Sequence, residues 1–229
     1  MSHNACTKQQ LLTYLSGYLT PKKWQLMQQV IAKRTRHITI VLENIFQEHN
    51  ASAVLRSAEI CGVQDVHIIQ SDCAFKVTPT VAMGASRWLN LYSYQQSMQA
   101  VMNLKERGYT IVATTPGATA YNLEDYNVES KTAFVFGTEN MGLSSYMLEQ
   151  ADTYLAIPMH GFTQSYNVSV STALIMHTLV QKLHASNSNW QLTQEEQLDI
   201  LLQWVRATVR AADMLERHFY KIIRAQETV

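Results

Sequence analysis

Short apolar runs rich in β-branched and aromatic residues alternate with stretches of helical period, and this alternation limits the fold more than any other feature of the sequence. Five runs predict buried strands: Ile38 to Leu42, Val66 to Ile69, Tyr109 to Ala113, Thr132 to Phe136 and Tyr154 to Ile157. Strands that are apolar throughout are typical of sheets covered on both faces. Strands that alternate with helices favour a mostly parallel sheet. We therefore predict an α/β domain.

Capping residues and glycines mark the expected helices. Between the strands we predict helices over Ala51 to Cys61, ended by Gly62, over Gln95 to Arg107, ended by Gly108, over Ser144 to Ala151 and over Val168 to His184. The last of these is a candidate either for a dimer contact or for plain core packing.

Helices are also expected at both ends of the chain. Thr7 can cap a first helix, and Thr20 followed by Pro21 starts a second that runs to about Ala32. A last helix is expected from Thr193 toward Arg224. We predict three regions: a basic helical extension over 1–36, an α/β domain over 37–185 and a helical extension over 186–229.

The net charge of zero conceals a strong segregation of charge along the chain. No acidic residue precedes Glu43, so the first 42 residues carry +6, and the segment from Arg206 onward carries +2, which leaves −8 in the middle. Basic flanks are typical of a surface that binds a polyanion, because neutralised phosphates release counterions. Two ordinary solvated helix faces are the alternative.

Several classes of protein are disfavoured by the composition. No run approaches the roughly 18 to 20 apolar residues that a membrane span needs, and the first residues are polar, so we expect a cytoplasmic protein without a membrane segment. The cysteines Cys6, Cys61 and Cys73 form no C-x-x-C pair and lack clustered histidines. Neither a disulfide framework nor a metal site is expected, and buried or inert thiols are the favoured reading.

A glycine-rich loop follows the predicted strand that ends at Phe136. Gly137 and Gly142 have the G-x-x-x-x-G spacing of a phosphate-binding loop, but Leu143 and Ser144 follow where that loop needs Lys and then Ser or Thr. The chain also lacks a G-x-G-x-x-G turn after a strand, so a dinucleotide fold is not indicated. Whatever binds there is recognised by other means.

Three segments place polar residues and glycines near strand ends, where α/β sheets bind ligands. The first holds Asn50 and Arg56, and Asn50 read alone is a helix N-cap and Arg56 a solvated side chain. The second is the Gly137 to Gly142 loop with Glu139, and the third runs from Ile157 to Ser169. Taken singly, each segment is more commonly an ordinary turn than a binding site.

Together the three segments resemble the SPOUT superfamily, in particular its TrmH-type tRNA guanosine-18 2′-O-methyltransferases. Asn50 to Arg56 is similar to the family's N-x-x-A-x-x-R motif, and Gly137 to Gly142 to its G-x-E-x-x-G motif. Ile157 to Ser169 is similar to I-P-M-x-G…S-L-N-V-S, with Tyr166 where the family usually has leucine. The resemblance covers the whole chain, the basic helical ends included.

The resemblance implies a C-terminal trefoil knot, one of the rare exceptions to unknotted topology. It also implies that the knot binds S-adenosyl-L-methionine largely through backbone groups, and that a homodimer interface lies beside this cleft. The cofactor positions carried over from the family are Thr114, Gly137, Ile157, Met159 and Tyr166.

The same resemblance implies catalytic roles in methylating guanosine 18 in the D-loop of tRNA. Arg56 and a substrate phosphate would handle the 2′-hydroxyl, because a guanidinium with a pKa above about 12 is a poor proton acceptor by itself. The remaining catalytic candidates are Asn50, Glu139, Ser165 and Asn167. Methylation of ribosomal RNA and a catalytically silent RNA-binding dimer remain the alternatives.

Overall fold

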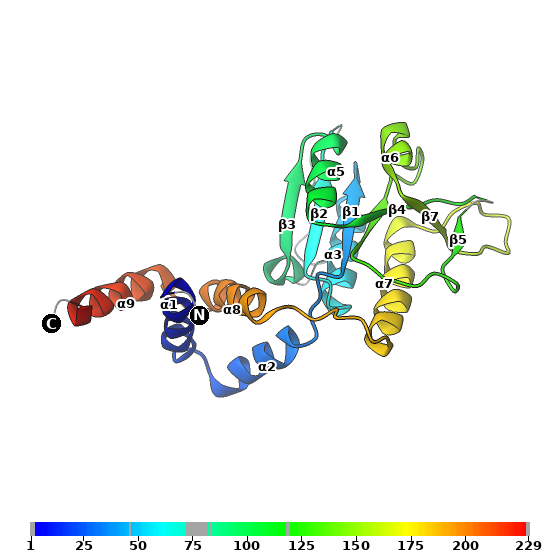
Figure 1. Ribbon diagram of the computed structural model, residues 1–229. Coiled ribbons are helices and arrows are strands. Elements are labelled where there is room, and N and C mark those ends of the chain that lie inside the picture. Colours follow the sequence, from blue (N-terminus) through cyan, green and yellow to red (C-terminus); the bar gives the residue numbers. More distant parts are fainter. Residues whose placement is uncertain (1–2, 46, 72–81, 83, 118–119, 228–229) are drawn as a thin grey trace. The chain divides into compact units, whose positions relative to one another are not determined.

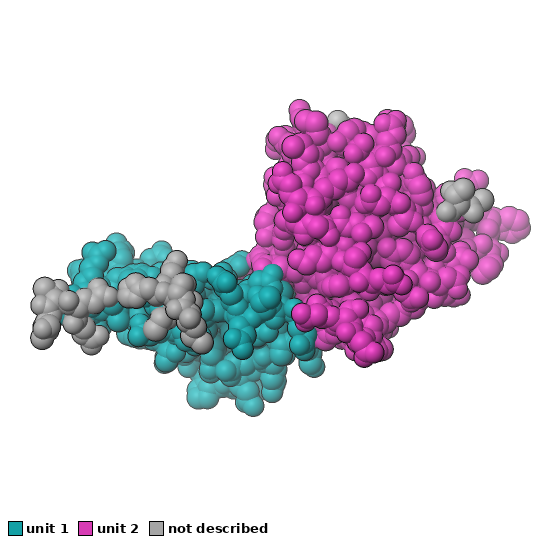
Figure 2. Space-filling model, viewed as in Figure 1, with its two compact units in different colours: residues 1–34, 191–229 teal, residues 35–190 magenta. Residues whose placement is uncertain are grey.

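A computed structural model describes residues 3–45, 47–71, 82, 84–117 and 120–227 of the chain (Figure 1). It divides into two compact units, which Figure 2 colours separately. Residues 35–190 form what we call the sheet unit, and residues 1–34 together with 191–229 form the arm unit. Among the described residues, no helix is long and apolar enough to cross a membrane.

The sheet unit contains one sheet in which every strand pairing described is parallel. Its order is β3-β2-β1-β6-β4-β7-β5. The bounds are β1 Ile38–Glu43, β2 Asp65–Ile69, β3 Asn90–Tyr94, β4 Thr110–Thr114, β5 Tyr121–Asn122, β6 Thr132–Phe136 and β7 Thr153–Ala156. The parallel α/β prediction and its five strands are therefore confirmed. Two further strands were not predicted: β3, an edge strand with alternating exposure, and the two-residue β5.

Helices cover both faces of this sheet (Figure 1). The helices are α3 Glu48–Ile60, α5 Ser97–Glu106, α6 Ser145–Gln150 and α7 Val168–Ala185, with a 3₁₀ turn η1 at Ala85–Trp88. Leu55 of α3 and Leu179 of α7 pack with Phe134 on one face. Leu104 of α5 and Met147 of α6 pack with Val135 on the other. Because neighbouring strand residues point to opposite faces, β6 contributes to both cores.

One face of α7 is therefore core, as the packing alternative predicted. Thr172, Met176 and Leu179 are fully buried. Val170 and Leu174, by contrast, remain 44% and 40% exposed on the same helix. The helix thus keeps an uncovered apolar strip within this single chain.

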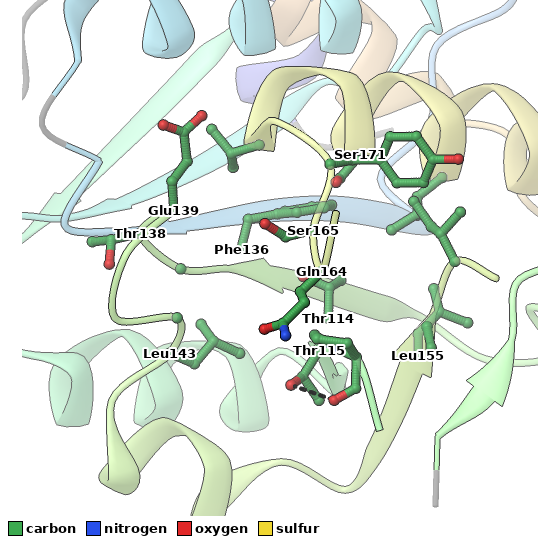
Figure 3. Close-up of a pocket in the computed structure, with 18 of the residues that line it drawn as sticks. Thr114, Thr115, Phe136, Thr138, Glu139, Leu143, Leu155, Gln164, Ser165 and Ser171 are labelled. Carbon is green, nitrogen blue, oxygen red and sulfur yellow. Dashed lines mark hydrogen bonds between the residues drawn. The ribbon is translucent and has the colours of Figure 1, made fainter. Parts of the chain in front are cut away.

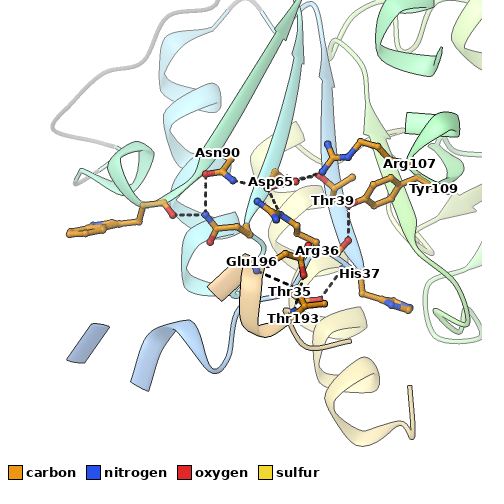
Figure 4. A network of polar contacts seen from close by, with 12 residues as sticks. Thr35, Arg36, His37, Thr39, Asp65, Asn90, Arg107, Tyr109, Thr193 and Glu196 are labelled. Atoms are coloured by element: carbon orange, nitrogen blue, oxygen red, sulfur yellow. Dashed lines mark hydrogen bonds and ion pairs between the residues drawn. The ribbon is translucent and has the colours of Figure 1, made fainter. Parts of the chain in front are cut away.

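A buried carboxylate ties the amino ends of the strands together (Figure 4). Asp65, the first residue of β2, accepts hydrogen bonds from Arg107 Nη2 at 2.6 Å, Arg36 Nε at 3.1 Å and Asn90 Nδ2 at 3.2 Å. Tyr109 Oη in turn donates to the Arg36 carbonyl at 2.7 Å. Two guanidiniums offset the cost of burying this charge, which would be destabilising if left unpaired. The network leaves the opposite, carboxyl ends of the strands for a ligand.

His67 lies next to this network in the middle of β2 and is fully buried. Its Nδ1 is 2.9 Å from Tyr94 Oη, which donates to Asn103 Oδ1, so Nδ1–H is the donor toward Tyr94. Within the described part of the chain, Nε2 is buried without a hydrogen-bond partner. Burial lowers the pKa of His67 to about 4. The positive charge of Arg107 lowers this pKa further, whereas the negative charge of Asp65 raises it.

The arm unit consists of α1 His3–Ser16, α2 Pro21–Ile31, α8 Gln194–Thr208 and α9 Ala212–Glu227. The start of α2 is confirmed, because Thr20 caps it through Lys23 N at 3.3 Å and Pro21 is its first residue. The expectation that Thr7 caps the first helix is wrong. The backbone is already helical from His3, so Thr7 lies inside α1.

The expected single C-terminal helix is also wrong, because the chain turns between α8 and α9. Ala211 adopts a left-handed φ of 56°, which costs roughly 1–2 kcal/mol for a residue with a Cβ. The turn allows both helices to contact α1: α8 buries Trp204, and Phe219 of α9 lies 5.4 Å from the Tyr14 ring. No glycine or proline marks this break, so tertiary packing alone produces it.

Candidate functional site

The candidate site is a cavity of about 380 Å³ at the carboxyl ends of β4, β6 and β7 (Figure 3). Apolar side chains such as Leu143, Leu155 and Ile175 line it together with polar loop residues. All five cofactor positions carried over from the family line this cavity: Thr114, Gly137, Ile157, Met159 and Tyr166. Ser165 lines it as well.

Two glycines give the loop after β6 its shape, each for its own reason. Thr138 and Gly142 exchange two backbone hydrogen bonds of 3.0 Å, which close the loop on itself. A Cβ on Gly137 would lie 2.2 Å from the Gly142 carbonyl oxygen, so only glycine fits there. Gly142 has φ 69°, a conformation that favours glycine. The G-x-x-x-x-G spacing is thus explained by a compact turn without any phosphate-binding lysine.

The far end of this loop is held by Glu43, a residue that the sequence analysis missed. Glu43 ends β1, is only 2% exposed, and accepts hydrogen bonds from Ser97 Oγ at 2.6 Å and from Ser144 Oγ and N at 2.8 Å each. Ser97 and Ser144 stand at the N-termini of α5 and α6, where the helix dipoles also favour a negative charge. The sequence feature that could have identified Glu43 is an acidic residue at the end of a largely apolar strand.

Three residues from the three separate motifs meet in one hydrogen-bond network. Asn50 Nδ2 donates to Glu139 Oε1 at 3.1 Å, and Asn167 Nδ2 donates to Asn50 Oδ1 at 3.1 Å and also to Glu139 Oε1. Along the chain, Asn50 is 89 residues from Glu139 and 117 residues from Asn167, and Glu139 is 28 residues from Asn167. Only the fold brings them together, and it does so beside the cavity that Glu139 lines.

The helices that carry the two asparagines explain how the network is oriented. Asn167 is the N-cap of α7 and accepts from Ser169 N at 2.9 Å, which fixes its amide. Asn50 is not the N-cap of α3, because that helix begins at Glu48, and its side chain is buried against the loop instead. The N-cap position belongs to Gln47, which accepts from Asn50 at 2.8 Å and donates to Glu139 at 3.3 Å. Sequence reasoning missed Gln47, whose only signal was its place three residues before Asn50.

A second cavity of about 260 Å³ lies next to the first, along the loop that carries Glu139. Ile45, Gln47, Asn50 and Val168 line it. The loop residues 138–141 and Val168 line both cavities, so the two are neighbours.

Arg56 is the one predicted catalytic residue that lines neither cavity and joins no part of the three-motif network. It is exposed, and among the described residues it makes no hydrogen bond or ion pair. It follows Asn50 by six residues on α3, which turns its side chain roughly 120° around the helix from the Asn50 face.

The cysteines and metal-binding residues add nothing to this site. Cys61 is half-buried, and burial raises the pKa of its thiol, which makes it a poorer nucleophile. Cys73 lies outside the described residues. Within the ranges that the structure describes, no group of three or more His, Cys, Asp or Glu is placed to hold a metal ion.

Comparison with known families assigns the part of the chain that forms this site. Residues 37–177 match the model of the SpoU rRNA Methylase family. The chain belongs to the SpoU methylase family. The matched region starts before β1 and ends within α7, so it contains all three motifs and both cavities.

Several known proteins resemble the chain over most of its length. A tRNA (guanosine(18)-2′-O)-methyltransferase of Borreliella burgdorferi is 41% identical over 202 residues, which is 88% of this chain and 93% of the relative. The enzyme of that name from Thermus thermophilus is 31% identical over 82% of this chain and 97% of its own. The crystal structure of the Aquifex aeolicus TrmH/SpoU tRNA modifying enzyme superposes with a TM-score of 0.75 at 28% identity, covering 82% of this chain and 98% of the other.

Proposed function

We propose that this SpoU-family chain transfers a methyl group from S-adenosyl-L-methionine to a ribose 2′-oxygen of RNA, and that its substrate is guanosine 18 in the D-loop of tRNA. The observation that carries the proposal is the meeting of Asn50, Glu139 and Asn167 beside a ligand-sized cavity. The substrate rests on the relatives named tRNA (guanosine(18)-2′-O)-methyltransferase, one of them 41% identical over 88% of the chain. A tRNA substrate also agrees with the expected cytoplasmic location.

The larger cavity fits the proposed cofactor. Its volume of about 380 Å³ lies in the range of roughly 300–1,000 Å³ that small-molecule sites occupy. Leu155 and Ile175 would provide apolar walls for the cofactor, while Thr114, Gly137 and Met159 would offer main-chain groups to hold it. When bound, the cofactor supplies an electrophilic methyl group on a sulfonium whose departing thioether is neutral.

The protein's own work is to align the ribose and to handle one proton. Glu139 already accepts three side-chain hydrogen bonds, which makes it an anchor for the amides of Asn50 and Asn167 that we assign to the ribose. Ser165 holds the nucleotide from the cavity wall. We assign to Arg56 the task of holding a substrate phosphate, whose oxygen takes the proton from the 2′-hydroxyl. Alignment of this kind can contribute on the order of 7 kcal/mol to catalysis.

A homodimer explains why Arg56 lies outside both cavities of its own chain. We propose that this guanidinium completes the site of the partner subunit, and that the exposed Val170 and Leu174 of α7 belong to the interface. Mixing Arg56→Ala with Gly137→Ala subunits tests this, since we expect each variant alone to have little activity. A mixed dimer regains one working site only if Arg56 acts across the interface, and no recovery contradicts the proposal.

We further propose that the Ile157 to Asn167 segment is threaded as a trefoil knot, the topology that the family resemblance implies. The parallel order β1-β6-β4-β7 and the position of this segment on the cavity wall support it. An experimental electron-density map of the segment would test the threading directly.

The arm unit is the proposed tRNA-binding part. Fewer of its basic residues are available to phosphates than the sequence alone suggests. Arg34 is buried over the Trp204 ring, and Lys8 pairs with Asp199 at 2.6 Å, so neither charge is displayed freely. The exposed basic residues of this unit include Lys22, Lys33, Arg210, Arg217 and Lys221. Affinity for tRNA should fall steeply as the salt concentration rises. In a plot of the logarithm of the binding constant against the logarithm of the salt concentration, each phosphate contact makes the slope more negative by close to one.

Methylation of purified tRNA and ribosomal RNA in parallel, with mapping of the modified nucleotide, tests the substrate. We expect a 2′-O-methyl group at guanosine 18 of tRNA. The SpoU rRNA Methylase family is named for ribosomal RNA, which makes ribosomal RNA the second candidate substrate. Methylation of ribosomal RNA alone would reject the tRNA assignment. Failure to bind S-adenosyl-L-methionine in calorimetry would instead favour a silent RNA-binding dimer.

A further inference from the structure

The second cavity, of about 260 Å³, is distinct from the one that we assign to the cofactor. It is smaller than the roughly 300 Å³ at which sites for complete small molecules begin, so it suits one part of a larger ligand. It adjoins the cofactor cavity across residues 138–141, which line both. A nucleotide whose ribose lies between the two cavities would have its base at this position.

The polar wall of this cavity has more free acceptors than donors. Glu139 Oε2 accepts one hydrogen bond, from Gln47 Nε2, and Gln47 Oε1 accepts one, from Asn50 Nδ2. Each oxygen therefore keeps a second lone pair. In Figure 3 the Glu139 carboxylate points away from Leu143 and Gln164 of the cofactor cavity. Asn140 lines the same wall, and among the described residues its side-chain amide makes no hydrogen bond.

Guanine is the base that matches this wall. Its Watson–Crick edge carries two adjacent donors, N1–H and the 2-amino group, beside the O6 acceptor, whereas adenine presents an unprotonated N1 that a carboxylate repels. Enzymes that act on an extruded nucleotide commonly read this edge. The apolar side chains of Ile45, Met141 and Val168 complete the cavity with surfaces against which a flat ring can pack.

We propose that this cavity holds the target base and selects guanine, with Glu139 and Gln47 accepting from N1–H and the 2-amino group and Asn140 donating to O6. The proposal rests on the proposed function and deepens it by naming the residues that choose the nucleotide. Gln47 and Asn140 are specificity residues in this scheme, because they meet the base and leave the reacting ribose to others.

The test uses full-length enzyme and synthetic tRNA that carries guanosine, inosine or adenosine at the target position. Inosine lacks only the 2-amino group, so we expect its kcat/KM to be about 10- to 100-fold lower than that of guanosine, in line with a lost specific base contact. Adenosine should not be methylated. Equal rates for guanosine and inosine in the wild-type enzyme would overturn the proposal.

Variants separate recognition from structural support. Gln47→Leu should lower both rates, because it removes the hydrogen bond to Glu139. It should lower the guanosine rate more, because only guanosine also loses the contact to the 2-amino group, so the ratio of the two rates falls toward one. A purely structural role would lower both rates equally and preserve the ratio, which would refute the assignment. Asn140→Ala should lower both rates about tenfold, since both bases carry O6. Gln95→Leu, an exposed residue directly after β3 that lines neither cavity, is the matched control.

A measurement of cofactor binding separates a failure of the guanine site from a failure of the proposed function. Gln47 does not line the larger cavity, so calorimetry should give an unchanged affinity of Gln47→Leu for S-adenosyl-L-methionine. Absence of methyl transfer to any tRNA by the wild-type enzyme would refute the proposed function itself. Methyl transfer that ignores the target base would refute only the guanine site.

Discussion

Glu139→Gln tests the three-motif network by changing one oxygen to an amide nitrogen. The carboxylate now accepts from Asn50 Nδ2 at 3.1 Å, from Gln47 Nε2 at 3.3 Å and from Asn167 Nδ2. A glutamine can offer only one oxygen, so at least one of these donors must face another N–H group. The substitution therefore removes at least one hydrogen bond to a charged group.

The expected cost follows from that loss. A hydrogen bond to a charged group contributes about 1.5–3 kcal/mol, which corresponds to a fall in kcat of roughly 10- to 150-fold if the network aligns the ribose in the transition state. Global stability should change little, because Glu139 is exposed and forms part of a loop. The enzyme should also keep its affinity for S-adenosyl-L-methionine within a few fold, since apolar and main-chain groups dominate that cavity.

Single-turnover methylation of tRNA at saturating cofactor is the assay, with thermal denaturation as the control for folding. Glu149→Gln, an exposed residue of α6 that lines neither cavity, is the matched variant and should retain full activity. A Glu139→Gln rate within twofold of wild type would show that the network does not align the reacting groups. A large drop in melting temperature would assign the residue a structural role instead.

Three further predictions follow from single residues. Gly137→Ala should abolish cofactor binding measured by calorimetry, because its Cβ would lie 2.2 Å from the backbone of Gly142, whereas Gly161→Ala, which meets nothing within 4 Å, should bind normally. The free energy of unfolding should fall by about 2 kcal/mol between pH 7 and pH 5, because His67 has a folded pKa of about 4 and the unfolded chain takes up the proton near 6.5. Denaturant titrations at both pH values should show this loss in wild type but not in His67→Phe, and an equal loss in both would reject the assignment. Arg56→Ala should lower methylation by at least about a hundredfold and Arg56→Lys by less, with folding unchanged because the side chain is exposed, and near-normal methylation by Arg56→Ala would remove this residue from the mechanism.

The sequence by itself determined the parallel α/β class and the positions of five strands. Largely apolar runs such as Ile38 to Leu42 have a strong local signal, because a strand buried on both faces needs apolar residues at most positions. Capping residues such as Thr20 act on their own helix, which is why they too could be located from local sequence. The edge strand β3 lacked this signal, since alternate residues such as Leu91 face outward.

Tertiary structure alone decided how the candidate site is assembled. Asn50 looked like a helix cap in isolation, but its amide is directed to Glu139, 89 residues away. Gln47 and Glu43 gave no motif, because their partners lie on other segments of the chain. The turn at Ala211 likewise has no local signal and exists because α8 and α9 both contact α1. Local propensity acts over a few residues, whereas a hydrogen-bond network depends on which distant segments the folded sheet brings into contact.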